Sequence, residues 1–403
     1  MSFSDVGPVR PAKDLLKVTR SSCLAAREAA GISISTERID ALLDSMPSTL
    51  PTDAKWLESG YKLPLAYPSR HAELNVICHL CFLNSLSGYR AAFHRNTREG
   101  AHKNIVKLVL SMYLEDPAGD SGLPLSAATL ESLTPLTVLG LWGVPTHVEE
   151  AHPNLPGAVV GTRRSDDMFE AAHVLCVAAN DTGRRLQQMK CPDLATFVER
   201  ALSTAKVDSN GDDEAFAALF ADAITTALPA FNDAYTIASS STTVYVHKRA
   251  YLLLSWLRAR FGNDEKAPPT PDASVLPAFV DNVIPSLLVH WGILDVASAK
   301  DESLRAWNAE IIQRDDAGKD KGSDSVVPGP KLAREQAYII RAAALDACHQ
   351  ISLRAHELAK QDESKRWMAG IHEALVDGYI WTKAKDADLR TVPRMVETET
   401  FMY

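Results

Sequence analysis

One lysine lies on an uncharged face of a predicted helix. Counting at helical spacing from Lys248, the same face carries Tyr251, Leu252, Ser255 and Ala259. An ammonium group against such a face is partly desolvated, which lowers its pKa or requires an anionic partner. Spacing alone favours the ordinary alternative, in which the lysine extends to solvent from the edge of a buried helix.

An aspartate stands four residues before a proline in an apolar segment. Pro285 has no N–H, and its ring clashes with the carbonyl of Asp281. The helix predicted over 276–294 must therefore break or kink at this aspartate. A carboxylate at such a break, next to Phe279, suits a cavity. An ordinary N-cap for the helix that opens near Pro285 explains it equally well.

Three more polar side chains lie on or beside apolar helix faces. Asp377 shares its face with Gly370, Ala374 and Trp381. The small residues on that face favour a structural explanation, in which a neighbouring helix approaches closely and the acid lies at the edge. Asn75 and Asn84 flank the apolar face of the helix predicted over 71–87. Amides there cap neighbouring backbone or bind a ligand, and the structural use is favoured.

The patterns of metal and cofactor sites are absent or incomplete. Cys78 and Cys81 form a CxxC pair, but no second pair of Cys or His residues stands at the spacing of a structural zinc site. We interpret both thiols as core residues on one helix face. The chain also lacks GxxxxGK[ST], GxGxxG and GxSxG motifs, which sets those enzyme classes aside. We expect no metal and no organic cofactor.

The elements that must position these residues are almost all helical. Apolar residues make up 46% of the 403-residue chain, enough for a large core. Helical spacing recurs over 14–29, 37–46, 71–87, 100–114, 126–140, 166–190, 194–204, 215–228, 244–261, 276–294, 331–360 and 363–385. The best strand pattern, 241–246, runs directly into a helical one. The sequence predicts an all-α fold as one domain over 1–403.

Polar stretches interrupt this helical pattern. Residues 206–214, 263–275 and 314–330 are predicted surface loops, and the last of them is low in apolar residues and expected to be mobile.

Charge and hydropathy restrict the partners and the location. The net charge of −9 disfavours binding to whole tRNA or to DNA, while a small nucleotide remains a suitable ligand. No apolar run reaches the length of a membrane span, and no secretory signal begins the chain. We expect a cytoplasmic protein that does not bind membranes.

Around Lys248 and Asp281 the chain resembles the queuosine salvage protein family. The resemblance rests on Lys248-Arg249-Ala250 and on Phe279-x-Asp281-x-x-x-Pro285-x-x-Leu288-x-His290-x-Gly292-x-Leu294. Further matches follow in order along the chain, at Asn75, Leu83-Asn84, Asp181-Thr182-Gly183, Ile340-Arg341, Asp377-x-Tyr379-x-Trp381 and Thr398-x-Thr400-Phe401-x-Tyr403. The block over 245–294 and the C-terminus are the dense, specific parts.

The resemblance implies a fold and an activity. Members are similar in fold to helical DNA glycosylases, with two helical lobes around a cleft. They hydrolyse queuosine 5′-monophosphate to free queuine, a base used in tRNA modification. Cleavage of the bond between C1′ and the base develops oxocarbenium character, which a carboxylate stabilises directly or by orienting a water.

The resemblance also implies roles for particular residues. Asp281 would be the catalytic carboxylate and Lys248 its partner, which holds the aspartate ionised or contacts the ribose or phosphate. The remaining substrate-binding residues would be Phe279 and His290 in the pocket wall, Tyr379 and Trp381 as stacking rings, and Asn75, Asn84, Arg341, Asp377 and Tyr403.

The chain departs from the family pattern at three places. An aromatic run of the family is replaced by Ser85-Leu86-Ser87-Gly88, an acid by Thr382, and basic residues by Glu397 and Glu399. The hydrolytic pair is kept while part of the base-binding shell is changed. Two alternatives therefore stay open, hydrolysis of a related nucleoside and a catalytically inactive protein that binds a nucleotide or another protein. DNA-glycosylase activity would follow from fold analogy alone and conflicts with the charge.

Overall fold

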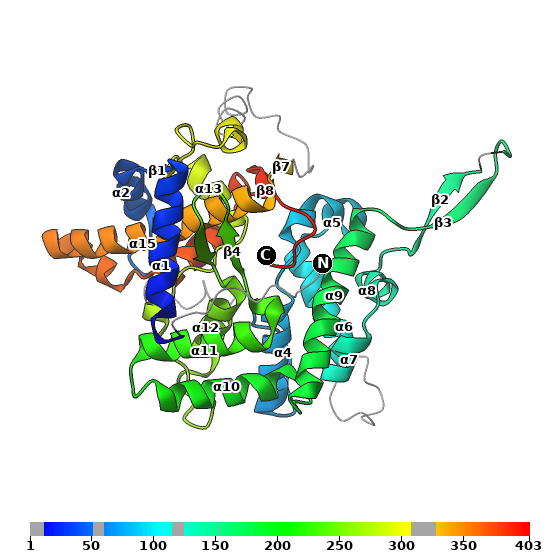
Figure 1. Ribbon diagram of the computed structural model, residues 1–403, viewed down its shortest axis with the longest axis horizontal. Helices are drawn as coiled ribbons and strands as arrows, with labels where there is room; N and C mark the ends of the chain where they lie inside the picture. Colours follow the sequence, from blue (N-terminus) through cyan, green and yellow to red (C-terminus); the bar gives the residue numbers. More distant parts are fainter. Residues whose placement is uncertain (1–11, 51–59, 115–124, 153, 308–327) are drawn as a thin grey trace.

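The computed structural model describes residues 12–50, 60–114, 125–152, 154–307 and 328–403. The α-helices are α1 (Leu15–Ala30), α2 (Thr36–Ser45), α4 (Arg70–Phe82), α5 (Arg90–Thr97), α6 (Ala101–Leu114), α7 (Ala127–Ser132), α8 (Pro135–Trp142), α9 (Asp167–Gln188), α10 (Leu194–Asp208), α11 (Asp213–Ala227), α12 (Lys248–Phe261), α13 (Val283–His290), α15 (Arg334–Gln361) and α16 (Glu373–Lys383). The predicted mostly helical fold is confirmed (Figure 1).

Short 3-10 turns and two-stranded sheets connect the helices. The 3-10 turns are η1 (Ala12–Asp14), η3 (Ser87–Tyr89), η4 (Pro229–Phe231), η5 (Ala273–Val275), η6 (Glu363–Gly370) and η7 (Leu389–Thr391). Antiparallel pairs join β1 (Ser33–Ile34) with β6 (Leu294–Asp295), β2 (His147–Ala151) with β3 (Val159–Arg163), and β4 (Ala234–Ile237) with β5 (Thr242–Tyr245). A parallel pair joins β7 (Pro328–Lys331) with β8 (Arg394–Val396). The β2–β3 hairpin extends away from the body of the molecule (Figure 1).

Several predicted helices have different bounds. The helix predicted over 276–294 occupies only α13, because the chain runs extended up to the break that Pro285 requires. The helix predicted over 126–140 is two helices, since Thr134 caps the N–H of Thr137 and Pro135 begins α8. The α5 helix was not predicted. The predicted loop over 206–214 begins within α10, and most of the loop over 314–330 lies outside the described residues.

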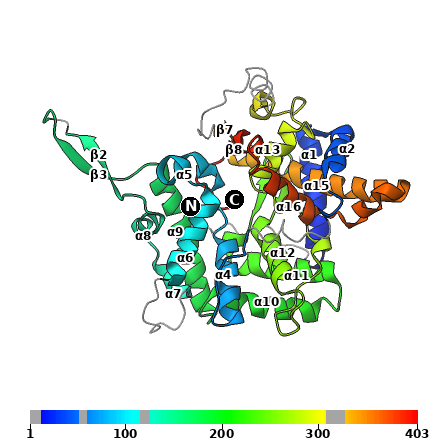
Figure 2. The same ribbon diagram turned by 180° about the vertical axis from the view of Figure 1, so that it is seen from behind.

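Buried apolar side chains form two cores. The larger core joins residues of α4 through α12, including Leu80, Phe220 and Leu254. The second joins α2, α13, α15 and α16, including Leu43 and Leu345. Helix α1 contributes to both. Figure 2 shows α1 and α15 on one side of the molecule and α6, α7 and α9 on the other. The likeness to DNA glycosylases and the extent of a single domain over 1–403 stay predictions.

One family match serves packing between helices. Gly183 lies on α9 where α7 crosses it, and a Cβ there would come within 2.4 Å of the carbonyl oxygen of Ala127 and of the amide nitrogen of Glu131. The close approach of these helices therefore requires glycine. The preceding Asp181 pairs with Arg184 and Arg185 of its own helix. Among the described residues, no helix combines the length and apolar character that a membrane span requires.

Candidate active site

The first residue of α12 places its ammonium group inside the protein. The carbonyl oxygen of Asp233 accepts the N–H groups of Val246 and His247, which holds the turn from β5 into α12. Lys248 is only 3% exposed. Its Nζ donates to the backbone oxygen of Asn84 at 3.1 Å and to Oδ1 of the same residue at 3.4 Å. The lysine therefore points inward rather than to solvent. Burial lowers its pKa, and the nearby Asp281 charge opposes that shift.

An extended segment carries Asp281 between the two cores. Successive side chains of extended backbone point to opposite sides. Ala278 and Val280 accordingly pack into the second core, while Phe279 and Asp281 face one pocket. Oδ1 of Asp281 accepts the N–H of Val283 at 2.6 Å, at the start of α13. The cavity explanation from the sequence holds, while the N-cap position of α13 belongs to Asn282, one residue after the aspartate.

A second aspartate faces the same pocket. Asp377 on α16 accepts the N–H of Phe279 through Oδ2 at 3.0 Å. Burial and the nearby charge of Asp281 raise the pKa of Asp377 to about 8, against the opposing effects of the Phe279 N–H and Lys248. Asp377 therefore holds a proton at neutral pH. The pocket contains one carboxyl group prepared to donate a proton and one carboxyl group beside a lysine.

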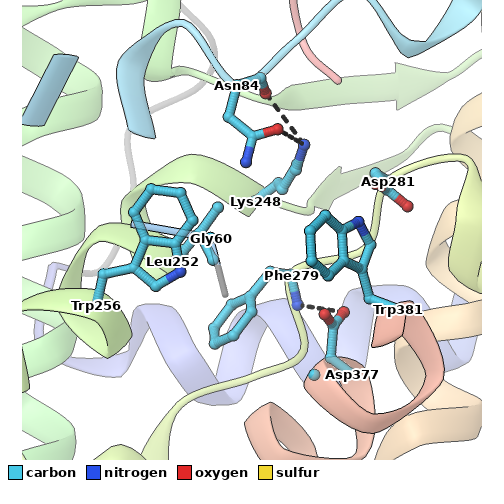
Figure 3. Close-up of a pocket in the computed structure, with 10 residues that line it drawn as sticks. Gly60, Asn84, Lys248, Leu252, Trp256, Phe279, Asp281, Asp377 and Trp381 are labelled. Atoms are coloured by element: carbon cyan, nitrogen blue, oxygen red, sulfur yellow. Dashed lines mark hydrogen bonds between the residues drawn. The ribbon is translucent and has the colours of Figure 1, made fainter. Parts of the chain in front are cut away.

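These side chains surround a small pocket of about 40 Å³. Its lining is Gly60, Asn84, Lys248, Leu252, Trp256, Phe279, Asp281, Asp377, Gly378 and Trp381. Figure 3 shows Lys248 directed toward Asn84, and Phe279 joined to Asp377 by a hydrogen bond. Lys248 and Asp281 line the same pocket but form no salt bridge within 4 Å. Aromatic and aliphatic walls stand beside three ionisable groups, in a space smaller than the roughly 300 Å³ of an ordinary ligand pocket.

The structure adds lining residues that were not predicted. Trp256 stands two helical turns after Lys248 on α12, so the face that suggested Leu252 extends to it. Gly60 packs against the Trp256 ring, because a Cβ there would lie 2.4 Å from a ring carbon. Helical spacing was a usable signal for Trp256. No pattern in the sequence indicated Gly60.

A second cavity of about 360 Å³ opens beside the first. Asn84, Lys248, Asp281 and Trp381 line both cavities. The Trp381 ring lies edge-on to His102 at 5.6 Å between centroids, and Nζ of Lys385 lies 3.5 Å from its centroid. The other basic lining residues are Arg90, Arg98, Lys103, Arg390 and Arg394. Arg90, Arg98 and Lys103 come from one segment around α5, and Arg390 and Arg394 come from a second segment near the C-terminus, so only the tertiary structure joins them.

Two predicted site residues hold the scaffold and do not line either cavity. Nδ2 of Asn75 donates to the carbonyl oxygen of Leu125 at 2.7 Å, and its Oδ1 accepts the N–H of Ala195. Arg341 is fully buried and forms a two-bond ion pair with Asp233, at 3.0 and 2.5 Å. Arg341 also donates to the carbonyl oxygen of Val280, so it holds the segment that carries Asp281.

The other three predicted residues also lie outside the pocket lining. Tyr403 donates to Oε2 of Glu397 at 2.7 Å, and its ring covers the Arg341 guanidinium at 4.3 Å. It therefore supports Arg341. Tyr379 is buried in the second core. His290 is the half-buried last residue of α13. None of the three is placed where it would touch a ligand in the pocket.

The cysteines and acids do not assemble into a metal site in the described part of the chain. No group of three or more His, Cys, Asp or Glu side chains there is arranged to hold a metal ion. Cys78 and Cys81 are fully buried in the larger core, which confirms their interpretation as core residues. Burial raises the pKa of the Cys81 thiol to about 12.

Comparisons with known proteins agree with the sequence resemblance. Residues 194–318, less than half of the chain, match a family model described as queuosine salvage protein. Among curated proteins, none matches the chain. The matched segment contains Lys248, Phe279 and Asp281 and indicates a role in queuosine salvage. The resemblance of this chain to the queuosine salvage protein family is thereby confirmed, in the segment that builds the centre of the pocket.

Proposed function

We propose that this protein hydrolyses the N-glycosidic bond of queuosine 5′-monophosphate, or of a related modified nucleotide, and releases the free base. The observation that carries the proposal is the meeting of Lys248, Asp281 and Asp377 in one aromatic-walled pocket. Two carboxyl groups beside one pocket are the usual acid and base of glycoside cleavage, and Asp377 is the one whose pKa is raised to about 8.

Asp281 is suited to stabilise the sugar cation. Its Oδ1 is held by the Val283 N–H, while its Oδ2 has no hydrogen bond among the described residues. A carboxylate fixed in this way presents one oxygen to positive charge that develops at C1′, or to the attacking water. Preorganisation by the helix start avoids reorientation of the group during the reaction. A covalent bond to C1′ is not required by this role.

Asp377 is suited to protonate the departing base. When the C1′–N bond breaks, its electron pair goes to the nitrogen of the base, and the neutral base requires a proton. Asp377 holds one at neutral pH because burial and the Asp281 charge raise its pKa to about 8. Water then adds to C1′, and the proton that it loses returns to the Asp377 carboxylate, which restores the starting state.

Lys248 contributes a fixed cation next to these acids. Both oxygens of Asn84 hold its Nζ, so its position does not depend on an ion pair with Asp281. We assign it to the ribose hydroxyl groups or the phosphate, at the junction of the two cavities. Phe279 and Trp381 supply faces against which the base packs.

The test is release of base, measured by chromatography. Purified protein is incubated with queuosine, its 5′-monophosphate and ordinary nucleosides, and we expect queuine from the monophosphate. Asp281→Asn should lower the rate by at least about 100-fold. Asp295→Asn is a matched control, because Asp295 also accepts a backbone N–H two residues on, at an exposed strand end. Full activity of Asp281→Asn would contradict the proposal.

The alternative is a binding protein that lacks hydrolysis. It is favoured by the serines at the position of the family's aromatic run, because Ser85 and Ser87 line the larger cavity where aromatic rings would stack. Stabilisation of the protein by the nucleotide in a thermal melt, without product from any nucleoside, would favour this alternative.

A further inference from the structure

The larger cavity carries unbalanced positive charge in an acidic protein. Its acids are Glu99, which pairs with Lys103 at 3.5 Å, and Asp281, which balances Lys248. Four further cations, Arg90, Arg98, Arg390 and Arg394, also line it. Such an excess, in a chain of net charge −9, indicates a ligand with several negative charges.

The inner wall of this cavity holds a buried arginine with unused hydrogen-bonding capacity. Arg394 is 5% exposed, and its Nη2 donates to the carbonyl oxygens of Ala384 and Leu389 at 3.3 and 3.0 Å. Its Nη1 is buried and has no acceptor among the described residues. Neither Arg394 nor Arg90 has a carboxylate within salt-bridge distance in the described structure. A buried guanidinium without an anionic partner lowers the stability of the fold, and a bound anion would remove that cost.

A helix also begins at this cavity. Gly100, the residue before α6, has no side chain to cap the helix, and Gly100 through Lys103 line the cavity. The backbone N–H groups of Ala101, His102 and Lys103 take part in no hydrogen bond among the described residues. Free N–H groups at the start of a helix of 14 residues bind anions. This observation is independent of Arg394 and points to the same ligand chemistry.

The size and depth of the cavity exceed the needs of one phosphate. At about 360 Å³ it is far larger than the adjoining pocket of about 40 Å³. The cations also lie at different depths, with Arg394 buried near Asp281 and Arg98, Lys385 and Arg390 exposed at the rim. A phosphate monoester carries a charge of about −2, which the inner arginines and the helix start already balance.

We infer that this cavity is a diphosphate-sized anion subsite, which accepts a second phosphate group beyond the one nearest the sugar. Arg394, Arg90 and the start of α6 hold the inner phosphate, and Arg98 and Arg390 hold the outer one. The anion subsite itself does not depend on the proposed function, but the identification of its ligand as a nucleotide rests on it. The substrate class then extends from 5′-monophosphates to nucleoside 5′-diphosphates.

Isothermal titration with inorganic phosphate and pyrophosphate tests the subsite without any turnover. We expect pyrophosphate to bind at least about tenfold more tightly than phosphate to the intact chain. Arg98→Gln and Arg390→Gln should each weaken the binding of pyrophosphate more than the binding of phosphate. Arg95→Gln is the matched control, because Arg95 lies on the same helix as Arg90 but pairs with Asp167 outside the cavity, and it should change neither affinity.

Equal affinity for the two anions, or no binding of either, would overturn the inference. Thermal melts of each variant identify any loss of folding, and two rim substitutions at separate elements provide independent readings. If pyrophosphate binds as expected but no nucleotide is hydrolysed, the proposed function fails and the subsite stands. If nucleotides are hydrolysed while pyrophosphate binds no better than phosphate, the proposed function stands and the diphosphate subsite fails.

Discussion

At the residue scale, the two aspartates of the pocket differ because their surroundings differ. Asp281 lies at a helix start that holds one of its oxygens, with Lys248 across the pocket. Asp377 is buried on α16 and faces the charge of Asp281. Two acids so close do not both ionise readily at neutral pH. Their separate roles follow from position and not from residue type.

The raised pKa of Asp377 predicts opposite effects on stability and activity. Since its pKa is about 8 in the folded protein, the folded state binds its proton more tightly than the unfolded state. The contribution of Asp377 to the free energy of unfolding is fully present below its pKa in the unfolded chain. It is lost as the pH rises through its pKa in the folded protein. Asp377→Asn, which keeps an acceptor for the Phe279 N–H, should therefore stabilise the protein by roughly 1–3 kcal/mol at pH 8.

The same substitution should reduce hydrolysis strongly and remove the fall in rate at alkaline pH. Urea unfolding at pH 5 and pH 9, together with rates over that range, measures both effects. Unchanged pH dependence of unfolding in Asp377→Asn would show that Asp377 is ionised at neutral pH and would remove it as the proton donor.

At the element scale, Arg341 of α15 fixes the extended segment that carries Asp281. It joins the Asp233 carboxylate to the carbonyl oxygen of Val280, and all three groups are buried. Burial alone would raise the pKa of Asp233, but Arg341 lowers it below its ordinary value. The ion pair therefore holds β4 and the segment before α13 in one arrangement.

Loss of this ion pair should destabilise the protein. Arg341→Met leaves Asp233 buried and unpaired, which should cost about 3–5 kcal/mol in urea unfolding. Arg354→Met is the control, because Arg354 forms a similar two-bond pair with Asp40 at a part-exposed site, where the cost should stay below about 1 kcal/mol. Similar losses for both variants would show that the buried pair has no special role.

The contact between α7 and α9 gives a second prediction at this scale. Gly183→Ala should cost about 1–3 kcal/mol, since the new methyl group meets the backbone of α7 at 2.4 Å. Gly140→Ala in the exposed face of α8 meets no atom within 4 Å and should be neutral or stabilising. Thermal melts of the two variants distinguish packing at Gly183 from an effect of glycine in helices generally.

At the scale of the whole molecule, a negative net charge coexists with one basic cavity. The chain has a net charge of −9, yet cations line the larger cavity. Such a field admits a small anion to the cavity and repels a long polyanion from the surface. We therefore predict no binding of duplex DNA or whole tRNA at physiological salt. Fluorescence anisotropy with labelled duplex and tRNA measures this, and submicromolar binding would contradict it.

The elements and the centre of the pocket were predictable because their signals are local. Helical spacing located most helices, and the clash at Pro285 located the break beside Asp281. The face of α12 indicated Lys248 and Leu252. In contrast, Asn75, Arg341 and Tyr403 matched a family pattern, but their contacts are with the scaffold. A polar residue in a motif does not show whether it binds a ligand or another residue.

The sequence by itself determined the helical class and the break at Asp281, because each depends on neighbours within one or two helical turns. For Lys248 the spacing favoured a side chain that extends to solvent, and only the tertiary structure placed its ammonium group inside. The tertiary structure decided which acids share the pocket, which of them keeps its proton, and where the basic cavity lies. Arg90 and Arg98, at the two ends of α5, meet Arg394 only after α5 and β8 pack around one space. Charge interactions and pKa values depend on the distances between groups and on their burial, and the separation of residues along the sequence gives neither.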